Sequence, residues 1–232
     1  MSMPASDRPR PDDVVYPESD GKPMAENPLQ GAAIRYLVTG FQRLFHGRSD
    51  TFVGGDFFWY PVEGDPTTVA APDVTVIVNL PGPVTEAEMP SYRQWVYGGQ
   101  VLVAVEVLSP SNTWREMTRK FRFYERHGVQ EYWVFEPEDG TLHVFVRDGE
   151  HLVAVSEQAG VIISPTTGVR VWVEGIALVV ADPDGRVWRT PVEEVIRAEL
   201  EAARADLEAA RADAAEAEVA ALRAELARLR GQ

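Results

Sequence analysis

The sequence of 232 residues contains no cysteine. This absence excludes a disulfide framework, a thiolate nucleophile and any zinc or iron–sulfur site with cysteine ligands. No apolar run approaches the roughly 18 residues that a membrane-spanning helix needs. The N-terminal stretch MSMPASDRPRPDDVVYPESDGKP also lacks the apolar core of a signal peptide. We therefore expect a cytoplasmic protein.

Positive charge is also scarce. The chain has 22 basic and 36 acidic residues, a net charge of −14, and its only lysines are Lys22 and Lys120. This balance is unfavourable for loose binding to nucleic acid, because phosphate binding depends on Lys and Arg. Any such function must come from a local basic patch or from metal ions. A lysine kept in an arginine-dominated chain indicates a role that needs its own chemistry, although a biased genomic composition would also make lysine rare.

The pattern of residues divides the chain into three parts. Residues 1–26 are rich in Pro, Asp and Ser without periodicity, which predicts a disordered or extended arm. Residues 27–187 alternate helical and strand patterns, which predicts an α/β (α+β) domain. Residues 191–230 contain the near-exact seven-residue repeats EAARADL (201–207) and EAARADA (208–214). They predict a coiled coil that assembles a homo-oligomer; a solvated single helix, or one folded back on the domain, is the alternative.

Helix and strand signals are clear within the middle part. Asn27 precedes a helix over Pro28–Phe45, and a second helix over Thr113–Arg126 should stop before Gly128. VLVAVEVL (101–108) is apolar on both faces, as in a central strand buried between layers. Asp139-Gly140 predicts a hairpin between two strands. Other strands are predicted at 51–53, 57–61, 74–78, 131–137, 141–148, 161–163, 169–173, 177–180 and near Val153.

Three residues are candidates for chemistry. Glu106 interrupts the most apolar strand, and a buried carboxylate costs several kcal/mol unless it is paired or binds a metal. Asp73 opens a strand, and Lys120 flanks the buried stripe of the following helix. Taken singly, Glu106 could pair with an arginine or face water, Asp73 could be a turn residue, and Lys120 could pair with Glu116. Together, two carboxylates and a cation can hold a hard dication and place water beside a phosphate.

One face of the second predicted helix carries four arginines, Arg115, Arg119, Arg122 and Arg126. They recur at i, i+4, i+7 and i+11, and form the one concentrated basic patch of the sequence. This patch predicts a surface for phosphates of DNA. The alternative is a solvated helix face with pairs such as Arg122–Glu125.

The stretches APDVTVIV, VEVLSPSN and TRKFRFYERHGVQEYWVFEP lie between Pro72 and Pro137. In this combination they resemble the Uma2-type family of restriction endonucleases within the PD-(D/E)XK nuclease superfamily. The resemblance implies a restriction-endonuclease-like mixed sheet flanked by helices, with a metal-dependent phosphodiesterase site.

The resemblance also implies residue roles. Asp73, Glu106 and the carbonyl of Val107 would ligate Mg²⁺ or Mn²⁺, and Lys120 would orient or deprotonate the attacking water. Two features depart from the superfamily: Leu108 stands where its usual lysine lies, and the first helix offers Gln30 but no clear acidic residue. From the resemblance and the three candidate residues we expect a metal-dependent DNA endonuclease. The alternatives are an inactive nuclease-fold binding module or scaffold assembled through the coiled coil, and a passive anchor for a coiled-coil interaction protein.

Overall fold

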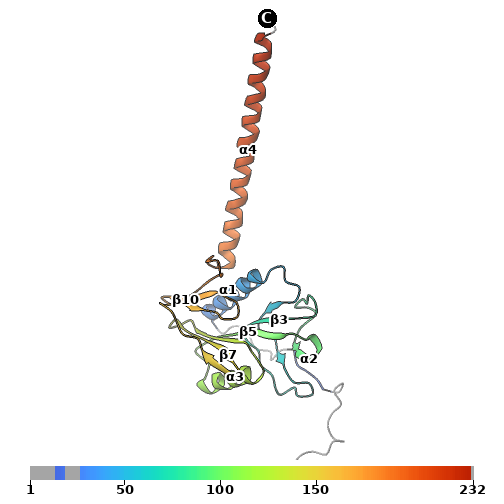
Figure 1. The fold of residues 1–232 in the computed structure, drawn as a ribbon, viewed down its shortest axis with the longest axis vertical. Coiled ribbons are helices and arrows are strands. Elements are labelled where there is room, and N and C mark those ends of the chain that lie inside the picture. Colours follow the sequence, from blue (N-terminus) through green and yellow to red (C-terminus); the bar gives the residue numbers. More distant parts are fainter. Residues whose placement is uncertain (1–13, 19–26, 231–232) are drawn as a thin grey trace, which may run out of the picture. The chain divides into compact units, whose positions relative to one another are not determined.

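The computed structural model describes residues 14–18 and 27–230 (Figure 1). The chain divides into two compact units between Trp188 and Arg189. The elements of the first unit are α1 (Pro28–Leu44), β1 (Phe52–Gly54), β2 (Trp59–Tyr60), β3 (Val74–Val78), β4 (Tyr92–Arg93), α2 (Gln94–Tyr97), β5 (Gln100–Val107), α3 (Trp114–Arg126), β6 (Glu131–Glu136), β7 (Thr141–Asp148), β8 (His151–Ala154), β9 (Ile162–Ile163), β10 (Arg170–Glu174) and β11 (Ala177–Ala181). The second unit contains the helix α4 (Pro191–Arg230).

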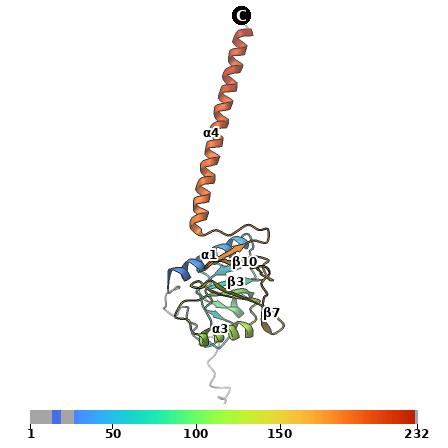
Figure 2. The same ribbon diagram turned by 90° about the vertical axis from the view of Figure 1, so that its left-hand side faces the viewer.

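A mixed six-stranded sheet organises the first unit, in the order β1-β3-β5-β6-β7-β8. Only β5 and β6 pair in parallel; the other neighbours are antiparallel. Helices α1 and α3 lie on opposite faces of this sheet (Figure 2). The prediction of a mixed sheet flanked by helices is confirmed, and β5 is the buried inner strand expected from its apolar sequence.

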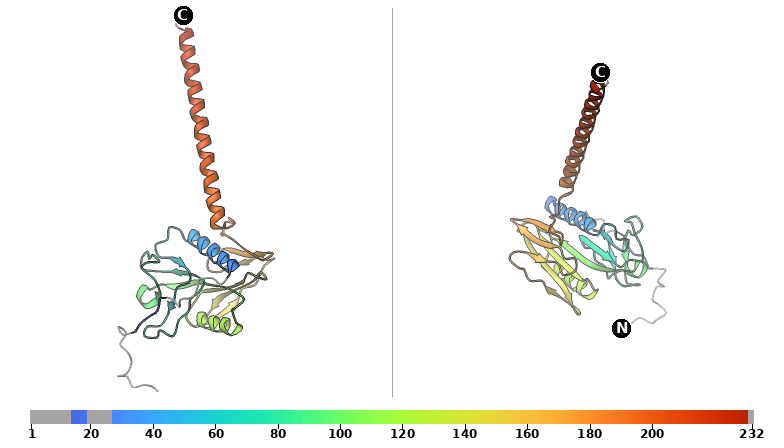
Figure 3. Two further views of the ribbon diagram at one scale, coloured as in Figure 1. Left: turned by 180° about the vertical axis from the view of Figure 1, so that it is seen from behind. Right: turned by 45° about the horizontal axis from the view of Figure 1, so that its top comes forward.

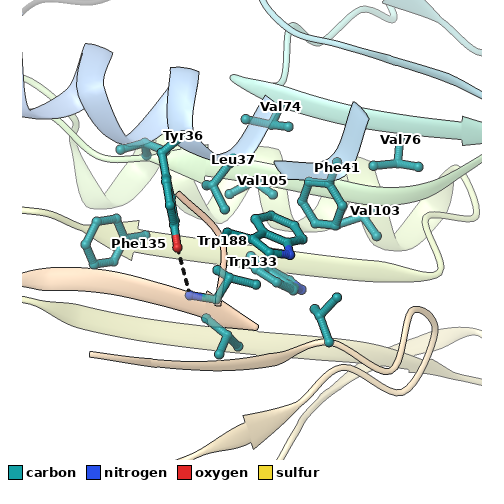
Figure 4. Packing of buried hydrophobic residues seen from close by; sticks show 14 of the residues in the cluster. Tyr36, Leu37, Phe41, Val74, Val76, Val103, Val105, Trp133, Phe135 and Trp188 are labelled. Carbon is teal, nitrogen blue, oxygen red and sulfur yellow. Dashed lines mark hydrogen bonds between the residues drawn. The ribbon is translucent and has the colours of Figure 1, made fainter. Parts of the chain in front are cut away.

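Helix α1 begins where the sequence predicts. The Asn27 side chain accepts a hydrogen bond from the Gln30 amide at 2.8 Å, and a proline follows the cap. Its buried face packs with the sheet and with the smaller β11-β10-β9 sheet, which lies on the same side (Figure 3). In this core the Val180 amide donates to the Tyr36 hydroxyl, and Phe41 packs edge-on against Trp188 (Figure 4).

Helix α3 covers the other face of the sheet. The Thr113 hydroxyl caps its first turn, and the helix stops before Gly128, at φ 82°, as predicted, with His127 at its C-cap. Tyr124 is fully buried, stacks on Trp59 and packs against Tyr132 from β6. This helix therefore fixes the surroundings of the side chains that β5 presents on that face.

Some parts of the fold were not predicted. Strand β4, the one-turn helix α2, and the small parallel pairing of β2 with β4 have no signal in the sequence. Within the predicted arm, residues 14–18 lie on the first unit: Tyr16 packs against Tyr60 and Trp95, and Tyr60 donates to the carbonyl of Pro17. The remainder of the predicted arm lies outside the described residues.

Helix α4 begins with a capping box. The Thr190 amide and hydroxyl both donate to the Glu193 carboxylate. The Glu193 amide donates in return to the Thr190 hydroxyl. Its apolar side chains are exposed along its length. No helix in the described part of the chain is long and apolar enough to cross a membrane.

Candidate functional site

Strand register places Asp73 beside Glu106. In the antiparallel pair of β3 and β5, Val74 lies opposite Val105. Asp73, just before Val74, therefore faces Glu106, just after Val105. The Val107 amide donates a 2.7 Å hydrogen bond to Asp73 Oδ2. The two carboxylates thus lie on the same face of the sheet, side by side at one end of the neighbouring strands β3 and β5.

Lys120 completes this group from α3. Its Nζ lies 2.6 Å from Glu106 Oε2, and the Tyr124 hydroxyl donates to the other carboxylate oxygen. Glu106 is only 2% exposed, so both of its oxygens meet donors inside the protein. Glu106 therefore pairs with a lysine, neither with an arginine nor with water, and Lys120 reaches inward to it.

The charges of the cluster are unbalanced. Burial raises the pKa of Asp73 well above its ordinary value, and the negative charge of Glu106 adds to the rise. Burial also raises the pKa of Glu106, against the opposing effect of Lys120. Burial alone would lower the pKa of Lys120, but its pairing with Glu106 outweighs this and the pKa is raised. Both carboxyl groups therefore hold a proton more tightly than exposed ones, because the one ammonium group does not offset the burial of two negative charges.

Gln30 makes a contact with the site that the sequence left unassigned. Its Nε2 donates a buried 2.8 Å hydrogen bond to the carbonyl oxygen of Val107, the predicted third metal ligand. A carbonyl oxygen has a second lone pair, so this bond leaves one acceptor position. Within the described residues, no group of three or more His, Cys, Asp or Glu side chains could hold a metal ion. The available donor set is two carboxylates and one carbonyl.

Further polar groups line the same face of the sheet. Thr75 and Tyr132 flank Ala104 across neighbouring strands, and among the described residues the hydroxyls of both are buried without a hydrogen-bond partner. Burial raises the pKa of Tyr132 well above its ordinary value, and the charges of Glu106 and Asp73 contribute. Asp56 adds to the rise in the pKa of Asp73. Of these groups, only Thr75 could have been assigned to the site from the sequence, because a residue two positions after Asp73 in a strand points to the same face.

The predicted arginine patch lies on the outer side of α3. All four side chains, Arg115, Arg119, Arg122 and Arg126, are exposed. After β5, Ser109 and Asn112 form a turn in which the Ser109 amide donates to Asn112 Oδ1 at 2.8 Å. This turn connects the end of β5 to the first turn of α3, which Thr113 caps.

Comparisons with known proteins place the chain. The sequence profile of the Uma2 family, described as "Putative restriction endonuclease", matches residues 3–179. The chain belongs to the Uma2 family. This match extends well beyond the stretch between Pro72 and Pro137 that carries the sequence resemblance, and it confirms the family prediction.

Among solved structures, this Uma2-family chain is similar to the crystal structure of "a putative nuclease belonging to DUF820" from Anabaena variabilis ATCC 29413. The two are 16% identical with a TM-score of 0.45, over 68% of this chain and 90% of that one. No curated protein matches the chain.

Proposed function

We propose that this Uma2-family protein is a metal-dependent endonuclease that hydrolyses DNA phosphodiester bonds. The observation that carries the proposal is the adjacency of two inward-facing carboxylates, Asp73 and Glu106, with a single ammonium group, Lys120, bonded to Glu106. The family description supports the reaction class. Two carboxylates with one cation leave an excess of negative charge, which a divalent ion would offset.

The donor set fits a hard cation. Asp73, Glu106 and the carbonyl of Val107 offer oxygen ligands, which Mg²⁺ and Mn²⁺ prefer. Among the described residues no hydrogen bond reaches Asp73 Oδ1, so one carboxylate oxygen is open to a ligand. When bound, such an ion supplies Lewis-acid stabilisation of a phosphoryl oxygen and lowers the pKa of bound water.

Lys120 and Tyr124 have complementary roles in this proposal. The ammonium of Lys120 donates to Glu106, so we assign it the orientation of water and the offset of charge on the phosphate, not the removal of a proton. Tyr124 donates to the other oxygen of Glu106 and fixes the direction of the carboxylate. Neither role requires a further acidic residue on α1.

Cleavage of supercoiled plasmid tests the proposal. With Mg²⁺ or Mn²⁺ we expect nicked and linear products, and none with EDTA. Asp73→Asn and Lys120→Ala should each reduce the rate at least about 100-fold, as loss of groups that stabilise the transition state does. Arg170→Ala, an exposed position on β10, is the matched control and should cleave like the wild type. Cleavage unaffected by both site substitutions contradicts the assignment.

The arginine patch of α3 is the proposed contact for the DNA backbone. Arg119→Glu with Arg122→Glu should weaken DNA binding in fluorescence anisotropy and reduce the slope of log affinity against log salt by about 2, one unit for each lost phosphate contact. Arg170→Glu serves as the control for a general change in net charge. An unchanged slope in the double variant contradicts the patch.

A second candidate function is a catalytically inactive nuclease fold that acts as a binding module. One observation favours it: both oxygens of Glu106 and one lone pair of the Val107 carbonyl already accept hydrogen bonds from Lys120, Tyr124 and Gln30. Calorimetric titration with Mn²⁺ separates the two functions. A binding module of this kind shows DNA affinity with neither metal-binding heat nor cleavage.

A further inference from the structure

Helix α4 exposes an apolar seam that nothing in the described chain covers. Its 40 residues span about 60 Å. Between 45% and 67% of the surface of each larger apolar side chain is exposed. These side chains are Val192, Val195, Ile196, Leu200, Leu207, Val219, Leu222, Leu226 and Leu229. An isolated helix in water is marginally stable, so a helix of this kind is stabilised mainly by packing of its apolar face.

From Ile196 onward the seam follows heptads in two frames. In the first, Leu200 and Leu207 occupy position a, and Ile196, Ala203 and Ala210 occupy position d. In the second, Val219 and Leu226 are at a, and Leu222 and Leu229 are at d. The frames meet within residues 212–217, where the core positions of both are alanine. Small side chains at the junction let the helices adjust locally without a clash.

The charged residues beside the seam are sorted by sign. Five of the six arginines of α4 lie at position e of these frames: Arg197, Arg204, Arg211, Arg223 and Arg230. From Ile196 to Arg230, position g is always acidic, with Glu199, Asp206, Asp213, Glu218 and Glu225. The apolar residues alone set these frames. The separation of charge is therefore a second, independent pattern.

This pattern distinguishes parallel from antiparallel partners. In a parallel pair, position g of one helix faces position e five residues later on the other. Four such pairs join opposite charges: Glu199–Arg204, Asp206–Arg211, Glu218–Arg223 and Glu225–Arg230. In an antiparallel pair, g faces g and e faces e, which sets acid against acid and arginine against arginine. Asp213 alone lacks a partner, because it lies at the junction of the frames.

We propose that the partner of this seam is a second copy of the chain, paired as a parallel, in-register two-stranded coiled coil. The seam and its flanks are complementary to themselves, so no other protein is needed to satisfy them. Each ion pair is individually weak at an exposed site, but the four on each side act together on orientation. Parallel pairing attaches both first units at the same end of the coiled coil. The inference stands whether or not the first unit cleaves DNA.

A charge-swap experiment on the full chain tests the pairing. One variant carries Arg204→Glu, Arg211→Glu, Arg223→Glu and Arg230→Glu; the other carries Glu199→Arg, Asp206→Arg, Glu218→Arg and Glu225→Arg. By light scattering, the wild type should have twice the mass of one chain. Each variant alone should self-associate at least about 100-fold more weakly, since every g–e contact becomes repulsive. An equimolar mixture should regain twice the mass.

The outer face of α4 provides the matched control. Glu208→Arg with Arg228→Glu changes two charges away from the seam and should leave the mass of the pair unchanged. Three results would overturn the proposal: a wild type that stays monomeric at its highest soluble concentration, a pair that survives in either swap variant, or a mixture that does not associate.

Orientation is tested in the same cysteine-free chain. Ala203→Cys, at position d, introduces the only thiol, so any disulfide joins two copies at that residue. Parallel pairing places the two thiols together, and mild oxidation should give a covalent dimer on a non-reducing gel. Antiparallel pairing separates them along the helix, and a chain that pairs without crosslinking overturns the parallel arrangement.

Discussion

Gln30 of α1 donates a 2.8 Å hydrogen bond to the carbonyl oxygen of Val107, at the end of the strand that carries Glu106. The first helix therefore contacts the candidate site through an amide, although the two residues are 77 positions apart in sequence. An amide donates to a carbonyl, whereas a carboxylate at the same place would repel it. A substitution at Gln30 can therefore place a negative charge directly beside the Val107 carbonyl.

Gln30→Glu should make the protein depend on divalent ions. Without metal, a carboxylate facing the Val107 carbonyl loses a buried hydrogen bond and adds repulsion, at a cost of about 2–3 kcal/mol. With Mn²⁺, the added ligand should raise the melting temperature by more than in the wild type, because an ion bound only by the folded state stabilises it. Gln30→Ala separates loss of the bond from gain of the charge. Equal Mn²⁺ shifts in all three proteins contradict a metal site at this position.

Lys120→Ala should destabilise the fold by about 2–4 kcal/mol, because it leaves the buried carboxylate of Glu106 without its cation. Urea denaturation gives the free energy of unfolding. The double variant Lys120→Ala with Glu106→Gln should recover part of the loss, since the uncompensated charge is removed. Arg119→Ala, an exposed neighbour on α3, should stay within about 0.5 kcal/mol of the wild type. A double variant less stable than Lys120→Ala contradicts the charge argument.

The candidate site was only partly predictable from the sequence. Glu106 stands out because a carboxylate within a strand that is apolar on both faces needs a partner. Its partners depend on how the helix packs. Lys120 lies 14 residues away on α3, and the apolar periodicity of that helix fixes only approximately which side chains point toward the sheet. The sequence offered Gln30 as the polar residue of the first helix, but its bond to the Val107 carbonyl was not predictable, because a polar residue near a helix start is ordinary. The short elements β4 and α2 were missed because local patterns of two to four residues do not rise above those of loops.

Asp182 should contribute pH-dependent stability. It accepts two 2.8 Å hydrogen bonds from Arg43 and one from Trp188, and although burial alone would raise the pKa of Asp182, these bonds lower it. A carboxyl with a lowered pKa in the folded state stabilises the fold above its unfolded pKa of about 3.9, and this contribution is lost as the pH falls through the folded value. Asp182→Asn should therefore be less stable than the wild type at neutral pH, by about 1–3 kcal/mol.

The difference between Asp182→Asn and the wild type should shrink when urea unfolding is repeated at about pH 3. Asp50→Asn is the control, because its pairing with Arg48 is exposed and the same change there should leave the midpoint unaltered. A difference that is constant with pH would mean that Asp182 contributes to stability through its packing and not through its charge.

Glu131 at the start of β6 is a buried carboxylate bound by neutral donors. Its side chain accepts hydrogen bonds from the Trp133 indole at 2.6 Å, the Ser164 hydroxyl at 2.9 Å, and the amide and hydroxyl of Thr166 at 3.1 and 2.7 Å. These bonds join the six-stranded sheet to the turn between β9 and β10. Glu131→Gln keeps the volume but replaces one acceptor oxygen with a donor, so at least one of these donors loses its partner.

We expect Glu131→Gln to cost about 2–4 kcal/mol in urea denaturation and to speed hydrogen exchange in the turn at residues 164–168 more than in β5. Glu136→Gln, at the other end of the same strand, changes the same groups at a half-buried position and should have a small effect on both measurements. Exchange that rises equally in the turn and in β5 would mean that Glu131 supports the whole core and not the junction of the two sheets. Exchange confined to the turn would identify Glu131 as the residue that attaches the small sheet.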